Sequence, residues 1–244
     1  MPTTAIEHAP GLWIRGFTPP LALTDFKLVA FDMDSTLINI ECVDEIADAA
    51  GRKAEVAAIT EAAMRGEIPD YAESLRRRVA LLAGLPESAL TEVYENRLKI
   101  TPGAAALIDR AHQAGLKVLL VSGGFTFFTE RLKPRLGLDF TRANRLVVAG
   151  GKLTGALDGG IVDADVKRST VEALCAQLGC EPSAAIVVGD GANDLKMMAI
   201  AGVSVAYRAK PVVRAQTTHA LNHCGLDALL NCFEDSFGAP VSGP

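Results

Sequence analysis

A short apolar segment that ends in two aspartates most constrains how this chain can fold. Residues 28–31 are Leu-Val-Ala-Phe, Asp32 follows directly, and Asp34 comes two residues later. An apolar run of this length is typical of a strand that is buried on both faces, as in a parallel sheet. Ligands bind at the carboxyl ends of such strands in open α/β sheets. The segment therefore predicts a central strand whose end carries two carboxylates.

Two aspartates this close together need either a structural reason or a compensating charge. Carboxylates about 4 Å apart repel by roughly 4 kcal/mol at an effective dielectric constant near 20. A turn or a helix cap is the common explanation of an isolated Asp-x-Asp pair, and a bound cation or a shared proton is the functional one. The rest of the chain has to decide between them.

Composition and charge exclude several classes of function. The chain has 244 residues, of which 49% are hydrophobic, so it can form one large domain or a core with an insertion. The net charge is −5 and Arg76-Arg77-Arg78 is the only cationic triplet. We therefore expect no nucleic-acid partner and no anionic membrane surface as partner. Five dispersed cysteines without a Cys-x-x-Cys pair indicate neither a disulfide framework nor a zinc site, and fit a cytoplasmic protein.

From the hydropathy pattern we expect neither a targeting segment nor a membrane segment. No apolar run approaches the roughly 20 residues of a membrane span. The first 26 residues lack the continuous apolar stretch of a secretion signal, and we expect them to form an irregular extension.

The order of the predicted elements indicates an α/β fold with an insertion. After the first strand, residues 40–100 have only helical periodicity, and strands alternate with helices again after residue 101. This alternation predicts a doubly wound (Rossmann-like) parallel sheet core with an inserted helical cap domain. The expected boundaries are an extension at 1–26, a core at 27–39 and 101–237, a cap at 40–100 and a tail at 238–244.

Two local features of the second half give further expectations. Gly150-Gly151 separates two short extended runs, which predicts a β-hairpin. A helix is expected from Phe125 to about Lys133, and Pro134 is expected to end it.

Polar residues follow three of the predicted strands, at the point where each strand ends. Ser122-Gly123-Gly124 follows one strand and Gly189-Asp190 follows another, in addition to Asp32 and Asp34. Each group alone is a common turn signature. Because the carboxyl ends of parallel strands share one edge of the sheet, we expect the three groups to converge.

The converging residue types suit phosphoryl transfer. Hard oxygen ligands such as Asp32, Asp190 and the Asp34 backbone carbonyl match the preference of Mg²⁺. Asp32 could then attack phosphorus as a nucleophile, and Asp34 could move the proton. Ser122 and neighbouring backbone N–H groups could hold the phosphoryl oxygens.

Taken together, the motifs resemble those of the haloacid dehalogenase-like hydrolases. The matching residues, in order, are Asp32-x-Asp34-x-Thr36, Ser122, Lys167 and Gly189-Asp190-Gly191-x-Asn193-Asp194. The resemblance covers about residues 27–230. Within the family, the chain is similar to members that hydrolyse O-phospho-L-serine in the last step of L-serine biosynthesis. The resemblance therefore implies a Mg²⁺-dependent hydrolase with a small-molecule substrate.

The resemblance also implies roles for individual residues. Asp32 would be the nucleophile and Asp34 the general acid and base. Mg²⁺ would be held by Asp32, Asp34 and Asp190, with Asp194 helping through water.

Substrate contacts follow from the same resemblance. The phosphate would be bound by Ser122, Gly123, Lys167 and Asn193. Glu41 would bind the substrate ammonium and Arg78 its carboxylate. A carboxylate and a planar guanidinium match the two charged groups of an amino acid. Both lie in the predicted cap, so that closure of the cap would join substrate recognition to the chemistry.

Several alternatives stay open at this stage. Glu41 also fits a first-turn helix charge, Lys167 also fits a surface lysine, and periodicity does not decide which of the three consecutive arginines faces the substrate. A different phosphomonoester, transfer to an alcohol, or a non-catalytic binding protein are the competing functions. A non-catalytic binding protein would usually lack the nucleophile or a metal carboxylate, whereas Asp32, Asp34 and Asp190 are all present. The sequence also leaves open whether the protein is a monomer or a homodimer, whether it is under feedback control, and what residues 1–26 do.

Overall fold

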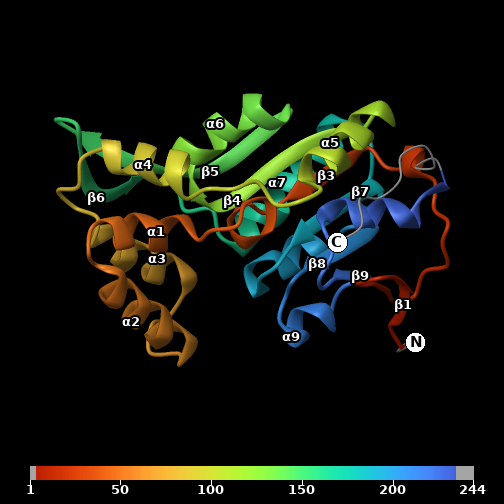
Figure 1. Ribbon diagram of the computed structural model, residues 1–244, viewed down its shortest axis with the longest axis horizontal. Coiled ribbons are helices and arrows are strands. Elements are labelled where there is room, and N and C mark those ends of the chain that lie inside the picture. The colour runs from red at the N-terminus through yellow and green to blue at the C-terminus, as the bar shows by residue number, and fades with distance from the viewer. Residues whose placement is uncertain (1–3, 235–244) are drawn as a thin grey trace.

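A nine-stranded sheet forms the centre of the computed structural model, which describes residues 4–234 (Figure 1). The strands are β1 (Ile6–Ala9), β2 (Leu12–Ile14), β3 (Leu28–Phe31), β4 (Lys117–Phe125), β5 (Phe140–Ala149), β6 (Lys152–Asp158), β7 (Ala185–Gly189), β8 (Val203–Tyr207) and β9 (His219–Leu221). Their order in the sheet is β1-β2-β9-β8-β7-β3-β4-β5-β6. The strands from β9 to β5 run parallel, and the outer pairs are antiparallel.

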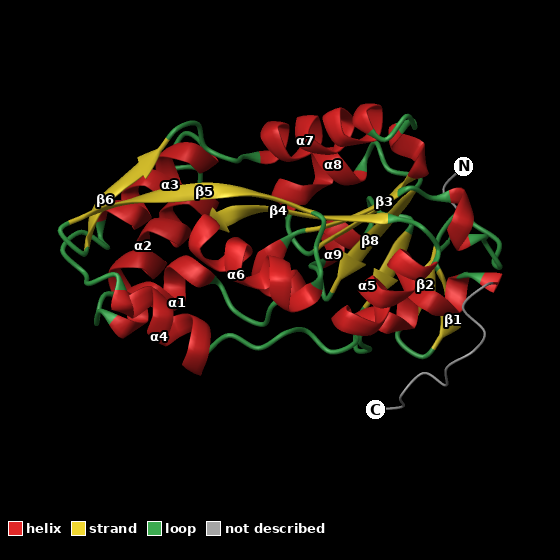
Figure 2. Cartoon of the chain, turned by 90° about the horizontal axis from the view of Figure 1, so that it is seen from above, coloured by secondary structure: helices red, strands yellow, loops and turns green. Residues whose placement is uncertain are grey.

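Helices cover both faces of this sheet (Figure 2). They are α1 (Cys42–Ala49), α2 (Lys53–Met64), α3 (Tyr71–Ala80), α4 (Ser88–Asn96), α5 (Ala104–Gln113), α6 (Thr126–Leu136), α7 (Ala164–Gln177), α8 (Leu195–Met198) and α9 (Pro211–Arg214). Residues of α5 and α6 pack in the larger apolar core, and residues of α7 and α8 pack in a second core across the sheet. The predicted doubly wound α/β fold is confirmed. None of the helices in residues 4–234 has the length and hydrophobicity needed to cross a bilayer.

Strand β3 holds the central place that its sequence predicts. Leu28 pairs with Lys117 of β4 on one side and with Ala185 of β7 on the other. All four residues of β3 are buried. The carboxyl ends of β3, β4 and β7 therefore meet at one edge, beside helices α1–α4 (Figure 1).

The hairpin of β5 and β6 reaches beyond the central sheet and contacts the helical insertion (Figure 1). The backbone of Leu153 in β6 exchanges hydrogen bonds with Gly84 and Leu85, each 2.8 Å long, and Glu87 donates to the Gly151 carbonyl over 2.9 Å. The hairpin around Gly150 and Gly151 is thus confirmed. Its tip is tied to the segment that joins α3 to α4.

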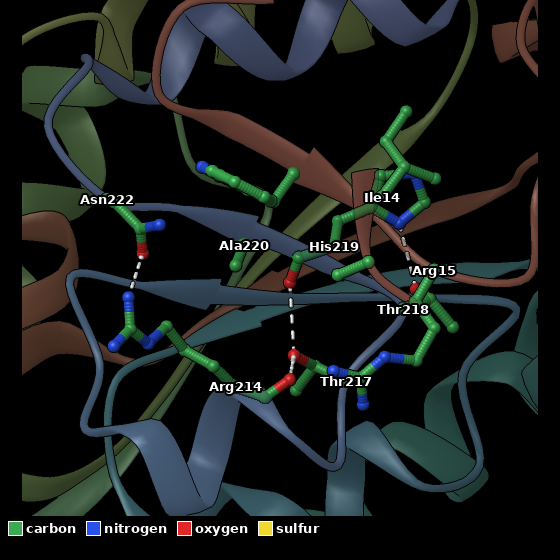
Figure 3. A pocket seen from close by; sticks show the side chains of 10 residues that line it. Ile14, Arg15, Arg214, Thr217, Thr218, His219, Ala220 and Asn222 are labelled. Atoms are coloured by element: carbon green, nitrogen blue, oxygen red, sulfur yellow. Dashed lines mark hydrogen bonds between the residues drawn. The ribbon is translucent and has the colours of Figure 1, made fainter. Parts of the chain in front are cut away.

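The first residues are more regular than expected, because the predicted irregular extension contains β1 and β2. Strand β2 pairs with β9, with Trp13 opposite Ala220. Three residues are too few for the alternation of apolar and polar side chains in a strand to be recognised from sequence. The pairing becomes favourable because β9 would otherwise be an unpaired edge of the sheet. A pocket of about 230 Å³ lies where β2, β9 and α9 meet (Figure 3). Arg15 donates there to the Ala215 carbonyl, and Arg214 donates to Asn222 over 2.9 Å.

The expected boundaries of the helix after β4 were wrong at both ends. Phe125 belongs to β4, and α6 continues through Pro134 to Leu136. The buried side chains of Phe128 and Leu132 hold the helix against the core, so its last turn survives the loss of one backbone hydrogen bond. Gly137, with φ of 69°, ends the helix instead.

His219 in β9 makes stability depend on pH. Its side chain is buried, its Nδ1 lies 2.8 Å from the Thr218 hydroxyl, and its Nε2 has no hydrogen-bond partner. Burial, and then the nearby His8, lower the pKa of His219 to about 4. The unfolded chain therefore binds this proton more readily, and stability falls as the pH drops from about 6.5 towards 4.

We expect this histidine to cost the protein up to about 2 kcal/mol between pH 7 and pH 5, at about 1.4 kcal/mol per pH unit below 6.5. Urea unfolding of the wild type and of His219→Gln at both pH values measures the difference. The variant should lose less stability on acidification than the wild type. Equal losses would show that His219 is not the group responsible.

Candidate active site

The two aspartates that follow β3 lie at the edge of the sheet and face a cavity of about 380 Å³. The Asp32 N–H donates to the Val188 carbonyl over 2.9 Å, which continues the pairing with β7 and fixes the backbone at Asp32. Asp32 is 4% exposed. Asp34 accepts a hydrogen bond from the Cys42 N–H at 3.1 Å through Oδ2, and its buried Oδ1 has no partner.

The cavity lies between the strand ends and the inserted helices. From the core side it is lined by Asp32, Asp34, Ser122, Gly123, Gly124, Phe125, Asp190, Ala192 and Asn193. From the helical insertion it is lined by Glu41, Val43, Thr60, Tyr71, Leu75 and Arg78. The structure thus brings together eight of the ten residues expected to form the site. The other two, Lys167 and Asp194, are buried directly behind Asp32.

Lys167 is a buried cation between two carboxylates. Its Nζ lies 2.6 Å from Asp32 Oδ1 and 2.7 Å from Asp194 Oδ1, and the residue is 1% exposed. Burial alone would lower the pKa of Lys167, but Asp194 and Asp32 outweigh it and raise the pKa above its usual range. The ammonium therefore stays charged and orients Asp32. The surface-lysine interpretation is wrong for this residue.

Three carboxylates form a cluster that fits a divalent metal. One oxygen from each of Asp32, Asp190 and Asp194 lies within 4.8 Å of the others. Burial and the neighbouring Asp194 raise the pKa of Asp190 to about 7, and the same two causes raise the pKa of Asp32. One ammonium faces three carboxylates, so the cluster holds more negative charge than its protein partners compensate. Hard oxygen donors with excess negative charge are what Mg²⁺ and similar ions bind.

The pKa of the Asp34 carboxyl lies above that of an ordinary aspartate. Burial, and then the charge of Glu41, raise the pKa of Asp34 to about 7. A carboxyl with a pKa near neutrality can both give and take a proton under physiological conditions. The free Oδ1 faces the carboxyl end of β4, because a Cβ atom on Gly124 would lie 3.4 Å from it.

Ser122-Gly123-Gly124 does not follow a strand as predicted, because β4 continues through these residues to Phe125. The segment is held in place by contacts that sequence reasoning did not assign to the site. Gly124 N–H donates to Ser122 Oγ over 2.8 Å. Asn144 in β5 donates to the Gly123 carbonyl over 2.7 Å and accepts from the Val162 N–H over 2.8 Å. Asn144 is buried in a strand, where an amide side chain needs hydrogen-bond partners. An asparagine within a predicted strand is therefore the signal that could have identified it as a residue that holds the neighbouring segment.

Glycine is required at position 123 because the helical insertion comes very close. A Cβ atom there would lie 2.0 Å from the Tyr71 hydroxyl, which itself donates a long 3.4 Å hydrogen bond to the Gly123 carbonyl. The carboxyl end of β4, which is the candidate phosphate-binding segment, is therefore in direct contact with α3.

The first turns of α3 present one face to the cavity. Tyr71, Leu75 and Arg78 have the i, i+4, i+7 spacing of one helix face, and all three line the cavity. Arg76 and Arg77 are exposed. The structure thus selects Arg78 from the arginine triplet, which periodicity alone had left open.

Glu41 lies where the chain enters α1 and faces the same cavity. Its Oε1 accepts a 2.6 Å hydrogen bond from the Ser35 hydroxyl. Although Glu41 is open to solvent through the cavity mouth, surrounding protein atoms partly desolvate the carboxyl and raise its pKa. The cavity therefore contains an acidic and a basic side chain on the wall opposite the two catalytic candidates.

Comparison with known proteins agrees with this site. The model of the haloacid dehalogenase-like hydrolases matches residues 26–202. The chain belongs to this family of hydrolases.

More specific similarity is to phosphoserine phosphatases. A curated phosphoserine phosphatase of Polaromonas sp. is 62% identical over 92% of this chain and 97% of its own length. Two solved structures, a phospho-aspartyl intermediate analogue of phosphoserine phosphatase and a substrate-bound phosphoserine phosphatase complex, are 38% and 37% identical. Each has a TM-score of 0.79 and covers 86% of this chain and 99% of the other.

Proposed function

We propose that the chain hydrolyses O-phospho-L-serine to L-serine and phosphate, with Mg²⁺ and through an aspartyl-phosphate on Asp32, as the last step of L-serine biosynthesis in the cytoplasm. The observation that carries this proposal is the composition of the cavity. The Asp32 and Asp34 pair lies on its core side, and Glu41 and Arg78 lie on its helical side. A phosphorylated amino acid has the matching phosphate, ammonium and carboxylate groups.

The reaction divides into two steps at Asp32. In the first, an Asp32 carboxylate oxygen bonds to phosphorus, the bond between phosphorus and the seryl oxygen breaks, and Asp34 gives its proton to that oxygen. In the second, Asp34 takes a proton from water as the water oxygen attacks phosphorus. Phosphate then leaves and the Asp32 carboxylate is regenerated.

The surrounding residues hold the phosphoryl group and the nucleophile. Ser122, Gly123 and Asn193 line the cavity and would bind phosphoryl oxygens, and Lys167 would orient Asp32 and contribute positive charge beside it. Asp32, Asp190 and the Asp34 backbone carbonyl, with Asp194, would hold the metal. When bound, Mg²⁺ offsets the negative charge of the carboxylates and of the phosphate.

Phosphate release across a panel of phosphomonoesters tests the proposal. We expect O-phosphoserine to give the highest kcat/KM in a panel with glycerol phosphate, phosphoethanolamine and an aryl phosphate. EDTA should abolish turnover, and excess Mg²⁺ should restore it. A better substrate without an amino-acid group would contradict the substrate assignment, and full activity in EDTA would contradict the metal requirement.

Replacing Glu41 with alanine should selectively impair the amino-acid substrate. Truncating one partner of a close charge pair costs about 2–5 kcal/mol, so we expect kcat/KM for phosphoserine to fall by about 30-fold or more. An aryl phosphate has no ammonium group to contact this carboxylate, so kcat/KM for the aryl phosphate should change by less than about 3-fold.

Glu73→Ala is the matched control for this measurement. Glu73 is on α3 but pairs with the exposed Arg77 at 2.7 Å. The control should therefore leave kcat/KM unchanged for both substrates. Equal losses on both substrates in Glu41→Ala would refute the role of Glu41 in binding the ammonium.

A further inference from the structure

Ser35 has a backbone conformation that serine rarely adopts. Its φ and ψ are 56° and 2°, and Arg208 is the only other non-glycine residue with positive φ in residues 4–234. The left-handed region is unfavourable for side chains with a Cβ atom, whereas glycine enters it freely. Glycine would therefore suit the backbone at position 35 better than serine does, and the serine needs another explanation.

The side chain of Ser35 provides that explanation through its contact with Glu41. Its Oγ donates to Glu41 Oε1 over 2.6 Å, a short bond of the kind made to an ionised carboxylate. The Ser35 N–H donates to the Ile40 carbonyl over 3.1 Å, which closes the loop between the two residues. The hydroxyl is thus held against Glu41 by the same backbone turn that carries the strain.

Glu41 has no competing partner that would orient it. It precedes α1 but makes no capping hydrogen bond with its side chain. Among residues 4–234 its carboxylate makes no ion pair and no hydrogen bond other than the one with Ser35. A neutral hydroxyl fixes one oxygen without cancelling the negative charge, which leaves the charge available to a cation in the cavity.

We infer that Ser35 is a positioning residue that aims the Glu41 carboxylate at the ammonium group of the substrate. The inference rests on the proposed hydrolysis of phosphoserine and adds a determinant of its specificity. Strained backbone at a binding site is consistent with this role, because such conformations persist where surrounding contacts hold them. Position 35 also lies between Asp34 and Thr36, so the same turn links the reacting end of the cavity to the recognition end.

The test is a pair of substitutions that separate the hydroxyl from the backbone. Ser35→Gly removes the hydroxyl and relieves the strain, and Ser35→Ala removes the hydroxyl but keeps the strain. Both should raise KM for phosphoserine, with kcat/KM lower by about 10-fold, or about 1.4 kcal/mol. The ratio of kcat/KM for phosphoserine to kcat/KM for an aryl phosphate should fall by a similar factor in both. The Tm of Ser35→Gly should lie above that of Ser35→Ala.

A double-mutant cycle with Glu41→Ala identifies the pathway of the effect. If Ser35 acts through Glu41, then Ser35→Gly should cause no further loss on phosphoserine in the Glu41→Ala background. The inference would be overturned if the losses in kcat/KM from the two substitutions added up in the double variant. It would also be overturned if kcat/KM fell equally for both substrates, so that their ratio stayed unchanged. Arg208→Gly relieves the other positive φ and should leave the ratio unchanged.

The wild type, measured in parallel, separates this inference from the proposed function. Failure of the wild type to prefer phosphoserine would refute the proposed function itself. If the wild type prefers phosphoserine and Ser35→Gly has the same ratio of kcat/KM values as the wild type, only the role of Ser35 is refuted.

Discussion

Asp32→Asn is expected to abolish phosphate release, with kcat lower by about 10⁴-fold or more. Asparagine keeps the shape of the side chain but cannot form the acyl-phosphate bond, and loss of a nucleophile removes the whole covalent route. Acid-quenched wild type mixed with phosphoserine should carry one phosphoryl group on Asp32, detectable by peptide mass spectrometry. The variant should carry none.

The fold should survive this substitution, which makes the result interpretable. Burial already raises the pKa of Asp32, so a neutral side chain is tolerated at that position. We expect similar Tm values for the wild type and Asp32→Asn in EDTA. Asp109→Asn, on the exposed surface of α5, is the matched control and should retain full activity. Substantial turnover by a folded Asp32→Asn protein would refute the covalent mechanism.

Lys167→Met is expected to cause the largest loss of stability. It leaves the buried carboxylates of Asp32 and Asp194 without their shared ammonium, and breaking a buried pair costs about 3–5 kcal/mol. Urea unfolding in metal-free buffer measures the change. The deficit should grow from pH 5 to pH 8. Burial raises the pKa of Asp32 and the Lys167 ammonium counteracts that rise, so loss of the ammonium raises the pKa further in the folded variant. A raised pKa in the folded state makes stability fall as the pH rises, and this fall should be larger in the variant than in the wild type.

Two further variants show whether the effect comes from the buried charges. Adding Asp194→Asn to Lys167→Met should recover part of the lost stability, because one unpaired charge is removed. Lys196→Met removes a lysine that pairs with Asp165 at the surface, where both side chains are more than half exposed. It should cost at most about 1 kcal/mol. A similar cost for Lys167→Met would show that the buried cluster is not electrostatically coupled.

Local sequence patterns were sufficient for the architecture around β3. An unbroken apolar run can only be satisfied by burial on both faces, and the alternation of such runs with helical periodicity requires a parallel sheet. The positions of Asp32, Ser122 and Asp190 at three strand ends then follow, since parallel strands share one carboxyl edge. Most of the candidate site could be predicted for this reason.

Long-range contacts decided what the periodicity left open. The pairing of β2 with β9 depends on an edge more than 200 residues away in the chain. The burial of Lys167 depends on two carboxylates from other elements, since nothing in its own helix distinguishes it from a surface lysine. The selection of Arg78 among three arginines depends on how α3 packs against the carboxyl end of β4.

The supports of the site were determined by tertiary structure alone. Asn144 donates a hydrogen bond to Gly123 and Ser35 donates one to Glu41, and a hydrogen-bond partner is a property of position in space. The sequence by itself determined which chemical groups reach the edge of the sheet, because hydrophobic burial follows local periodicity. Only the folded chain determined how those groups are oriented, because orientation depends on distances between segments that are remote in sequence.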